Sequence, residues 1–263
     1  MSLNDHIRRT LASNLARFPH SWLDKGEAIF QEAQGKGWGY GGVTHEIAAL
    51  TKCLTNAGLA EPLIILDVGA NTGDWTDAAH SEWPRARIFA IEPSLPAYSK
   101  LCKRMEKIDN VSSWKLALGE VCGEATLFSN ESGSELSSLR QRHLEHFGVS
   151  LSLTEEVALS TLDDFVMDNG IPAVDVLKID VEGYEMEVLR GGEEVFKKVK
   201  VVQFEWGEPS TGASVHWVDF WYFFLEQGMT IYRITPQGAK EVTRYHPRDE
   251  VMTWTNYLAV RQV

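Results

Sequence analysis

The chain has 263 residues, of which 44% are hydrophobic, a size and composition that suit one large α/β domain with an extension. Lys and Arg number 25 against 37 Asp and Glu, which gives a formal net charge of −12. This charge repels nucleic acid at long range, so it disfavours RNA and DNA as partners. The basic run Lys197–Lys200 is more typical of a solvated helix end than of a nucleic-acid site.

Cysteine usage and hydropathy bear on where the protein works. The three cysteines form an odd count without a C-x-x-C pair, which predicts reduced thiols and a cytoplasmic protein. The N-terminus lacks the apolar run of a secretory signal, and no apolar segment of about 18 residues predicts a membrane span. The sequence leaves the oligomeric state open.

Residues 1–60 predict an N-terminal helical extension. Four apolar residues recur on one stripe of its first helix, namely Ile7, Leu11, Leu15 and Phe18. Such a stripe is typical of an amphipathic helix, and a transit peptide is the alternative. The glycine-rich loop Gly35–Gly42 follows, either as a connector or as a lid over cofactor or acceptor. A further helical pattern ends near Gly58.

A strand–turn–helix unit opens the main domain, residues 61–263. Leu63–Leu66 predicts a buried parallel strand, a glycine-bracketed turn follows, and Asp74–Ala78 can begin a helix. In Rossmann-like sheets, ligands bind beyond the carboxyl ends of the strands. A second strand, Arg87–Ile91, ends at Glu92, and an acid roughly 20 residues past the turn is the expected partner of ribose hydroxyls.

The composition of the turn favours one nucleoside over others. A dinucleotide site uses G-x-G-x-x-G, whose second glycine admits a pyrophosphate, whereas this turn has only Gly69 and Gly73, with Asn71 between them. S-adenosylmethionine (SAM) carries no phosphate. Asp67 can hold its ammonium, directly or through water, while N–H groups of the turn face its carboxylate. A turn without a ligand and an NAD-dependent oxidoreductase are the less favoured alternatives.

Four separated motifs carry a family resemblance: Asp67–Gly73, Glu92–Pro93, Thr161–Phe165 and Leu177–Glu185. On these motifs the chain resembles the FkbM-type SAM-dependent methyltransferases, from about Glu61 to its end. The resemblance implies a class I fold, an α/β domain with a doubly wound, seven-stranded, mostly parallel sheet. It also implies O-methylation of a hydroxyl on a sugar, a glycan or a small secondary metabolite, with SAM as the cofactor. The cofactor-binding residues that we expect are Asp67, Gly69, Asn71, Gly73, Trp75, Glu92, Pro93, Ala117, Leu118 and Asp180.

The segment after the second strand departs from a simple alternation of strands and helices. Val111–Leu118 predicts the third strand, and in the class I fold its end gives the adenine an apolar edge. Short strands are predicted at Glu124–Ser129 and Glu155–Ser160, and the polar insertion between them is expected to shape the acceptor pocket. The acceptor-contact candidates are Ser134, Ser137, Ser138, Arg140 and His143. An exposed helix over Arg140–His146 is the alternative.

The fourth expected strand of the sheet predicts where the chemistry lies. Period-two geometry along Ala173–Asp180 places Lys178 and Asp180 on one face at its carboxyl end, together with Glu182 if the strand continues that far. Methyl transfer needs alignment and a group that takes the hydroxyl proton. The catalytic candidates are Lys178, Asp180, Glu205 and His216, with the two acids and the histidine as alternative bases. A structural ion pair of Lys178 with one of these acids is the competing interpretation.

The same acids raise the question of a metal. Asp180, Glu182 and Glu205 offer the oxygen ligands that Mg²⁺ or Ca²⁺ prefers, but their spacing is not diagnostic and we assign no metal-binding residue. A SAM-binding module without catalysis is the alternative to an enzyme. Downstream, the aromatic run His216–Leu225 predicts a helix packed on the sheet, and two further strands are predicted at Met229–Ile234 and Thr253–Val260.

Overall fold

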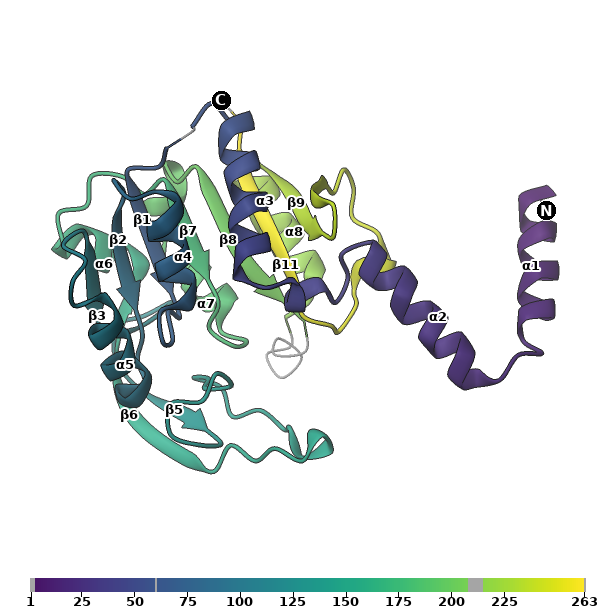
Figure 1. The fold of residues 1–263 in the computed structure, drawn as a ribbon, viewed down its shortest axis with the longest axis horizontal. Coiled ribbons are helices and arrows are strands. Elements are labelled where there is room, and N and C mark those ends of the chain that lie inside the picture. The colour runs from purple at the N-terminus through teal and green to yellow at the C-terminus, as the bar shows by residue number, and fades with distance from the viewer. Residues whose placement is uncertain (1–2, 60, 208–214, 263) are drawn as a thin grey trace.

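The computed structural model describes residues 3–59, 61–207 and 215–262. A central sheet dominates it, with strand order β10-β9-β11-β8-β7-β1-β2-β3 (Figure 1). The strands from β8 to β3 in this order are parallel, and β11 runs antiparallel to both β8 and β9. The strands are β1 Ile64–Val68, β2 Arg87–Ile91, β3 Val111–Trp114, β7 Val176–Ile179, β8 Val201–Trp206, β9 Met229–Thr235, β10 Gly238–Glu241 and β11 Thr255–Arg261.

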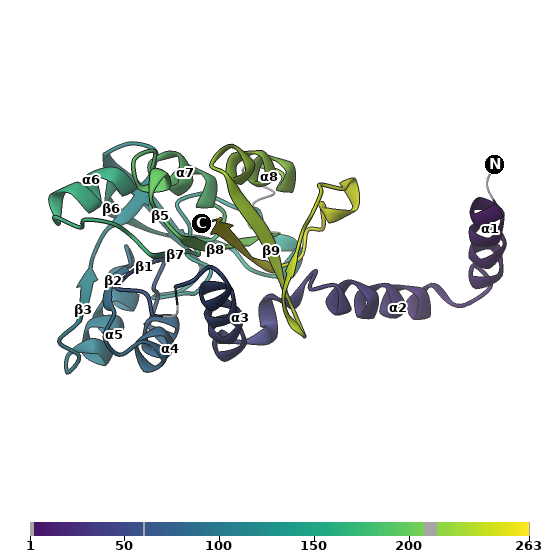
Figure 2. The same cartoon turned by 90° about the horizontal axis from the view of Figure 1, so that it is seen from above.

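Helices cover both faces of this sheet, as a doubly wound fold requires (Figure 2). One face carries α3 Val43–Asn56, α4 Asp74–Glu82 and α5 Leu95–Met105, and the other carries α6 Leu162–Asp168, α7 Glu185–Arg190 and α8 Trp217–Glu226. Neighbouring residues of a strand point to opposite faces. Ile65 therefore packs with the residues of α3 and α4, whereas Leu66 packs with those of α6 to α8. Short 3₁₀ helices lie at Trp38–Gly41 (η1), Glu145–Phe147 (η2), Val195–Lys197 (η3) and Pro247–Asp249 (η5).

The expected α/β sheet is confirmed, with two differences in its strands. The sheet contains the seven strands that the class I fold implies, and an eighth, β10, extends one edge. The sequence of β10, Gly-Ala-Lys-Glu, carries no apolar alternation, since both faces of this edge strand are at least partly exposed. The prediction of one strand over Val111–Leu118 was wrong. The chain leaves the central sheet after Trp114, and Ala117–Gly119 forms a separate strand, β4.

β4 belongs to a second, three-stranded sheet of order β4-β6-β5, with β5 at Gly123–Ser129 and β6 at Leu153–Thr161. β5 and β6 confirm the two short strands predicted in the insertion. This small sheet lies beyond one end of the central sheet, below it in Figure 1. The fully buried Ala117–Gly119 pairs with β6, while the exposed Lys115 between β3 and β4 forms an ion pair with Glu155.

Two helices precede the domain, α1 Leu3–Leu15 and α2 His20–Ala33, and both project away from it (Figures 1 and 2). The helical extension is thus confirmed, but the apolar stripe of its first helix is exposed instead of packed. In α8 the predicted stripe buries Trp217, Phe220 and Phe224, whereas Leu225 at its end is exposed. Within the described ranges, no helix combines the length and apolarity that crossing a bilayer needs.

Candidate active site

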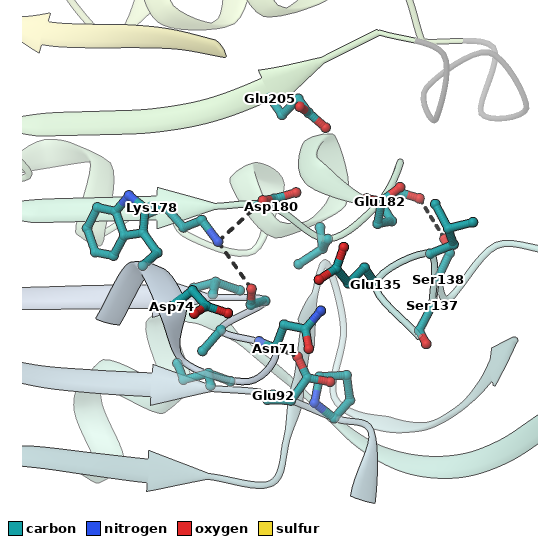
Figure 3. Close-up of a pocket in the computed structure, with 18 of the residues that line it drawn as sticks. Asn71, Asp74, Glu92, Glu135, Ser137, Ser138, Lys178, Asp180, Glu182 and Glu205 are labelled. Carbon is teal, nitrogen blue, oxygen red and sulfur yellow. Dashed lines mark hydrogen bonds and ion pairs between the residues drawn. The ribbon is translucent and has the colours of Figure 1, made fainter. Parts of the chain in front are cut away.

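A cavity of about 510 Å³ opens at the carboxyl ends of β1, β2, β7 and β8, where the strand order reverses (Figure 3). This is the position at which doubly wound sheets bind their ligands. Most of the predicted site residues line it: Gly69, Asn71, Trp75, Glu92, Pro93, Ala117, Leu118, Lys178, Asp180 and Glu205. Three predicted residues are absent from the lining, namely Asp67, Gly73 and His216.

The turn after β1 is shaped by a glycine that no other residue can replace. Gly69 has φ +79°, and a Cβ added there would lie 1.7 Å from the backbone oxygen of Asp180. Both Gly69 and Ala70 donate their N–H to the carbonyl of Ile91, at 2.9 and 3.0 Å. The turn is therefore held between the ends of β2 and β7, with Asn71 at its tip in the left-handed region.

Glu92 joins this turn to the end of β2. One carboxylate oxygen accepts the N–H of Asn71 at 2.9 Å, and the other accepts the N–H of Ser94 at 2.8 Å. Burial raises the pKa of Glu92 to about 7, although these two backbone hydrogen bonds oppose the rise. Each oxygen keeps a free lone pair, and the side chain lines the cavity. The geometry suits two hydroxyl donors from a ribose.

Lys178 is the centre of a buried ion-pair network. Its Nζ lies 3.2 Å from Oδ1 of Asp67 and 3.4 Å from Oδ2 of Asp180, and it donates to the carbonyl of Gly69 at 3.1 Å. Burial opposes the charged ammonium, but the attraction of Asp67, Asp180 and Glu46 outweighs it and raises the pKa of Lys178. The structure thus contains the ion pair of the competing interpretation. Asp180 keeps 41% of its side chain exposed and still faces the cavity.

Asp67 and Gly73 have structural positions instead of the predicted contacts. Asp67 is fully buried behind Lys178, and its Oδ2 accepts the hydroxyl of Thr76 at 2.6 Å. It cannot meet a ligand ammonium directly. Gly73, with φ +88°, precedes α4 and faces the side chains of Leu101 and Met105. Sequence spacing could not separate these residues from the lining, because residues close in sequence at the end of a strand or in a turn can point to opposite sides.

His216 lies away from the cavity. It is exposed at the start of α8, where its backbone N–H donates to the carboxylate of Asp219 at 2.7 Å. Its position therefore explains why α8 begins here. The histidine was a candidate base because it is close in sequence to the end of a strand, but it does not line the cavity.

Three carboxylates meet opposite Glu92, those of Asp180, Glu182 and Glu205. One oxygen from each lies within 4.8 Å of the others, so they could hold a hard divalent cation. Burial, followed by repulsion from Asp180, raises the pKa of Glu182 to about 8 despite its ion pair with Arg142 at 2.9 Å. Burial, followed by repulsion from Asp180 and Glu182, raises the pKa of Glu205 well above its usual range.

The insertion supplies the other wall of the cavity. Ser134, Ser137 and Ser138 line it as expected, and the hydroxyl of Ser138 donates to the carbonyl of Glu182 at 2.7 Å (Figure 3). Two other acceptor candidates do not line it. Arg140 bonds to Gly183 and pairs with Glu187, and the side chain of His143 is 93% exposed. Of the exposed helix that was the alternative over Arg140–His146, only the 3₁₀ turn Glu145–Phe147 is present.

The glycine-rich loop borders the cavity through Gly39 and Gly42. Next to it, α3 contributes Glu46, which the sequence analysis missed. Glu46 accepts hydrogen bonds from Gln203 at 2.6 Å and Asn256 at 3.3 Å, and burial raises its pKa. One signal was present: Glu46 precedes Leu50 by one helical turn, so it stands on the buried face of α3. An acid on such a face indicates a polar site.

Comparison with known proteins decides the family. The methyltransferase FkbM domain matches residues 67–231, which include the turn, Glu92, the insertion and the carboxylate cluster. The chain belongs to the FkbM methyltransferase family. Fold, cavity and family thus agree for this FkbM methyltransferase, and the family expected from its four motifs is confirmed.

Relatives in other organisms are similar over part of their length. The chain is 30% identical over 185 residues to methyltransferase sdnD of Sordaria araneosa, covering 60% of this chain and 71% of that protein. It is 29% identical over 154 residues to 2-O-methyltransferase NoeI of Sinorhizobium fredii, covering 55% and 63%. With hexuronic acid methyltransferase AglP of Haloferax volcanii it shares 26% over 140 residues, covering 53% and 54%. The chain therefore spans between about half and seven tenths of these relatives.

Proposed function

We propose that this FkbM methyltransferase transfers the methyl group of SAM to a hydroxyl of a sugar, a glycan or another small hydroxylated molecule. One observation carries the proposal: a single cavity contains both Glu92, with two free lone pairs, and the Asp180–Glu182–Glu205 carboxylates. The first group suits a ribose, and the second suits a hydroxyl that must lose a proton.

The lining residues fit SAM in shape and in charge. Ile91, Pro93, Ala117 and Leu118 form an apolar wall beside Glu92, as a flat base next to the ribose requires. The described lining residues include seven acidic side chains, from Glu46, Asp74, Glu92, Glu135, Asp180, Glu182 and Glu205, and one amine, from Lys178. Bound SAM would supply a methyl group on a positively charged sulfonium. Those acidic side chains that are ionised attract that cation.

The three carboxyl groups of Asp180, Glu182 and Glu205 differ in their surroundings, and this difference favours one of them as the base. Burial and neighbouring carboxylates raise the pKa of Glu182 to about 8 and raise the pKa of Glu205 well above its usual range, which favours the protonated form of both; a protonated carboxyl can donate a hydrogen bond to an acceptor oxygen. Asp180 is held by Lys178, is partly exposed to the cavity and is the carboxylate that we assign as the base. The acceptor oxygen would form a bond to the methyl carbon as the carbon–sulfur bond breaks, and its proton would pass to Asp180. Alignment supplies the larger share of the acceleration.

The names of two relatives support the acceptor class. One is a 2-O-methyltransferase and another is a hexuronic acid methyltransferase. Carboxylate oxygens and the hydroxyls of Ser134 and Ser137 offer hydrogen-bond acceptors and donors for such a hydroxylated molecule. Because the chain has a net charge of −12, it repels a neutral acceptor less than a polyanion. The charge therefore again disfavours nucleic acid as the acceptor.

The proposal is tested with SAM labelled on its methyl group and a panel of neutral monosaccharides and hexuronic acids. Asp180→Asn should lower turnover by about 100-fold or more while SAM affinity and melting temperature stay near those of the wild type. Glu205→Gln should keep much of the turnover, because glutamine resembles the protonated carboxyl. Full activity in Asp180→Asn with loss in Glu205→Gln would reverse the assignment.

Calorimetric titration separates the remaining alternatives. We expect SAM to bind and NAD not to bind, because the turn lacks the second glycine of a pyrophosphate site. Binding of NAD without SAM would refute the proposed cofactor. Binding of SAM without transfer of label to any member of a broad hydroxylated panel would favour a SAM-binding module without catalysis.

A further inference from the structure

The N-terminal helices carry a large apolar surface that the described chain leaves uncovered. We call residues 3–33 the arm. Seven large apolar side chains of the arm are between 48% and 72% exposed, namely Ile7, Leu11, Leu15, Phe18, Trp22, Ile29 and Phe30. No residue of α2 is buried. Apolar patches of this extent on a protein surface indicate an interaction site.

The exposed residues are ordered along each helix. Ile7, Leu11 and Leu15 recur at intervals of four, which places them on one face of α1. In α2, Trp22 and Ile29 are two helical turns apart, and Phe30 lies beside them. Both helices are therefore amphipathic, although neither face rests on the domain in either view (Figures 1 and 2). An apolar stripe of this kind on a helix is typically buried against another protein surface.

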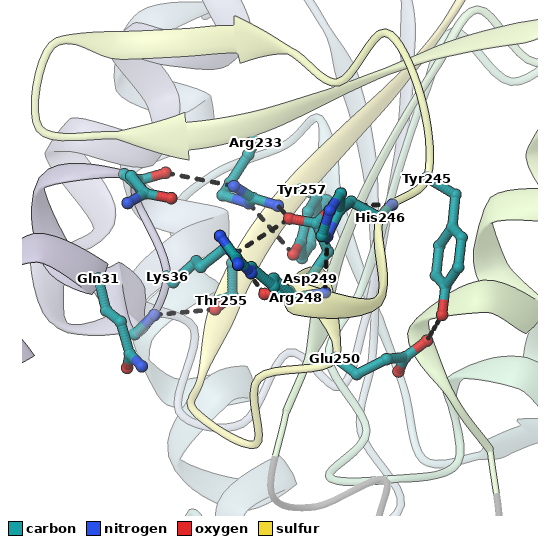
Figure 4. A network of polar contacts seen from close by, with 12 residues as sticks. Gln31, Lys36, Arg233, Tyr245, His246, Arg248, Asp249, Glu250, Thr255 and Tyr257 are labelled. Carbon is teal, nitrogen blue, oxygen red and sulfur yellow. Dashed lines mark hydrogen bonds and ion pairs between the residues drawn. The ribbon is translucent and has the colours of Figure 1, made fainter. Parts of the chain in front are cut away.

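The base of the arm is firmly attached to the domain (Figure 4). Lys36, which is only 7% exposed, forms an ion pair with Asp249 at 3.1 Å, and Asp249 pairs with Arg233 at 2.8 Å. The N–H of Gly37 donates to the hydroxyl of Thr255 at 2.9 Å. A Cβ at Gly35 would lie 2.4 Å from the carbonyl of Ile234, so the chain after α2 lies directly against β9. The arm leaves the domain from an anchored point.

We propose that the arm docks on a second copy of this chain and forms a two-fold dimer. The arm leads away from its own domain, so its stripe is placed to meet another molecule. In a two-fold arrangement each copy contributes the same surface, and an amphipathic helix pair is self-complementary when two such pairs face each other. The occupant of the stripe is then the arm and adjoining domain of the partner copy.

Charge favours a second copy over a membrane. Residues 1–20 contain Arg8, Arg9 and Arg17 against one acid, Asp5, whereas the whole chain has a net charge of −12. The first helix is thus attracted to the acidic domain of another copy. An anionic bilayer would attract α1 as well, but α2 carries three acids, Asp24, Glu27 and Glu32, against Lys25. These acids and the acidic domain would be repelled by that surface.

The area is sufficient for a stable dimer. At about 100 Å² of exposed surface for each side chain, the seven apolar residues offer about 700 Å² per copy, close to the roughly 800 Å² per partner of a standard interface. Polar atoms around the stripe add to this area. The arm therefore provides nearly the area of one side of a standard interface.

The proposal is tested by sedimentation velocity on the full chain between 1 and about 100 µM. The wild type should sediment as a dimer, and the triple variant Trp22→Glu, Ile29→Glu, Phe30→Glu should sediment as a monomer with an unchanged melting temperature and SAM affinity. Met167→Glu is the matched control, because Met167 is 69% exposed on α6 and should leave the dimer intact. A monomeric wild type, or a triple variant that remains dimeric, overturns the proposal.

Two further measurements address the charge argument and the membrane. Reversal of charge by Arg8→Glu and Arg9→Glu should raise the dimer dissociation constant by about tenfold or more at low salt and by less at high salt. Flotation with vesicles of phosphatidylcholine and phosphatidylserine should leave the wild type unbound. Flotation of the wild type that the triple variant loses would overturn the proposal in favour of a bilayer.

Discussion

Replacing Glu92 by alanine tests the proposed cofactor site most directly. Both oxygens of Glu92 face the cavity end of β2, each with one backbone N–H already bound and one lone pair free. Loss of hydrogen bonds from ribose hydroxyls to a charged carboxylate costs about 1.5–3 kcal/mol, so the dissociation constant for SAM should rise about 10- to 150-fold. Calorimetric titration at pH 8 measures this, with circular dichroism to show that the variant is folded.

The control and the pH dependence separate a specific contact from a general change in charge. Glu135→Ala removes one exposed carboxylate from the same cavity and should change SAM affinity by less than about threefold. Because the pKa of Glu92 is raised to about 7, Glu92 is mostly protonated below that pH. The cationic SAM prefers the ionised carboxylate, so its binding there requires that Glu92 lose its proton. Wild-type affinity should therefore fall by up to about tenfold per pH unit below 7, and Glu92→Ala should lose part of this dependence. Wild-type affinity in a folded Glu92→Ala protein refutes the ribose assignment.

Four further predictions concern stability and metal. Burial raises the pKa of Glu185 to about 7, so its contribution to the free energy of unfolding is present at low pH and is lost as pH rises through 7. Urea denaturation from pH 5 to 8 should show this fall in the free energy of unfolding. Glu185→Gln should make the free energy of unfolding depend less steeply on pH. Lys178→Met leaves Asp67 buried without a counter-charge and should lower the free energy of unfolding by about 3–5 kcal/mol in the same assay. Gly69→Ala forces a Cβ against the backbone of Asp180 and should lower the melting temperature strongly, whereas Gly26→Ala, with nothing within 4 Å, should not. Turnover should survive EDTA, and a loss that Mg²⁺ alone restores would show a cation at Asp180, Glu182 and Glu205.

The parts of the fold that the sequence predicted well are those determined locally. The parallel strands β1, β2 and β7 are mostly apolar runs bounded by turn residues, and Glu92 follows its strand directly, so Arg87–Ile91 could be placed to the residue. β10 could not, because it is a partly exposed edge strand without apolar alternation, and the break between β3 and β4 could not, because β4 pairs with a distant partner. Ala117–Gly119 is a strand of the small sheet only because β6, about 40 residues later, lies beside it.

The candidate site shows the same division. Lys178 and Asp180 could be found from period two on one strand, and the structure brings them within 3.4 Å. The burial of Asp67 and the exposure of His216 depend on how neighbouring elements pack, which no spacing records. Glu46 reaches the cavity from a helix outside the best-matched motifs, and its partners Gln203 and Asn256 are more than 150 residues away.

The small sheet has a consequence for how acceptor choice can change. Residues 117–161 form one continuous stretch whose strands pair only with each other in the described structure, and its loop supplies Ser134, Ser137 and Ser138 to the cavity. Glu92 lies outside this stretch, and so does the turn after β1. Exchange of the loop between β5 and β6 with that of a relative is therefore a graft that leaves the methyl-donor half unaltered. If this loop contacts the acceptor as proposed, such an exchange should change acceptor choice without altering the turn and Glu92 at the proposed SAM site.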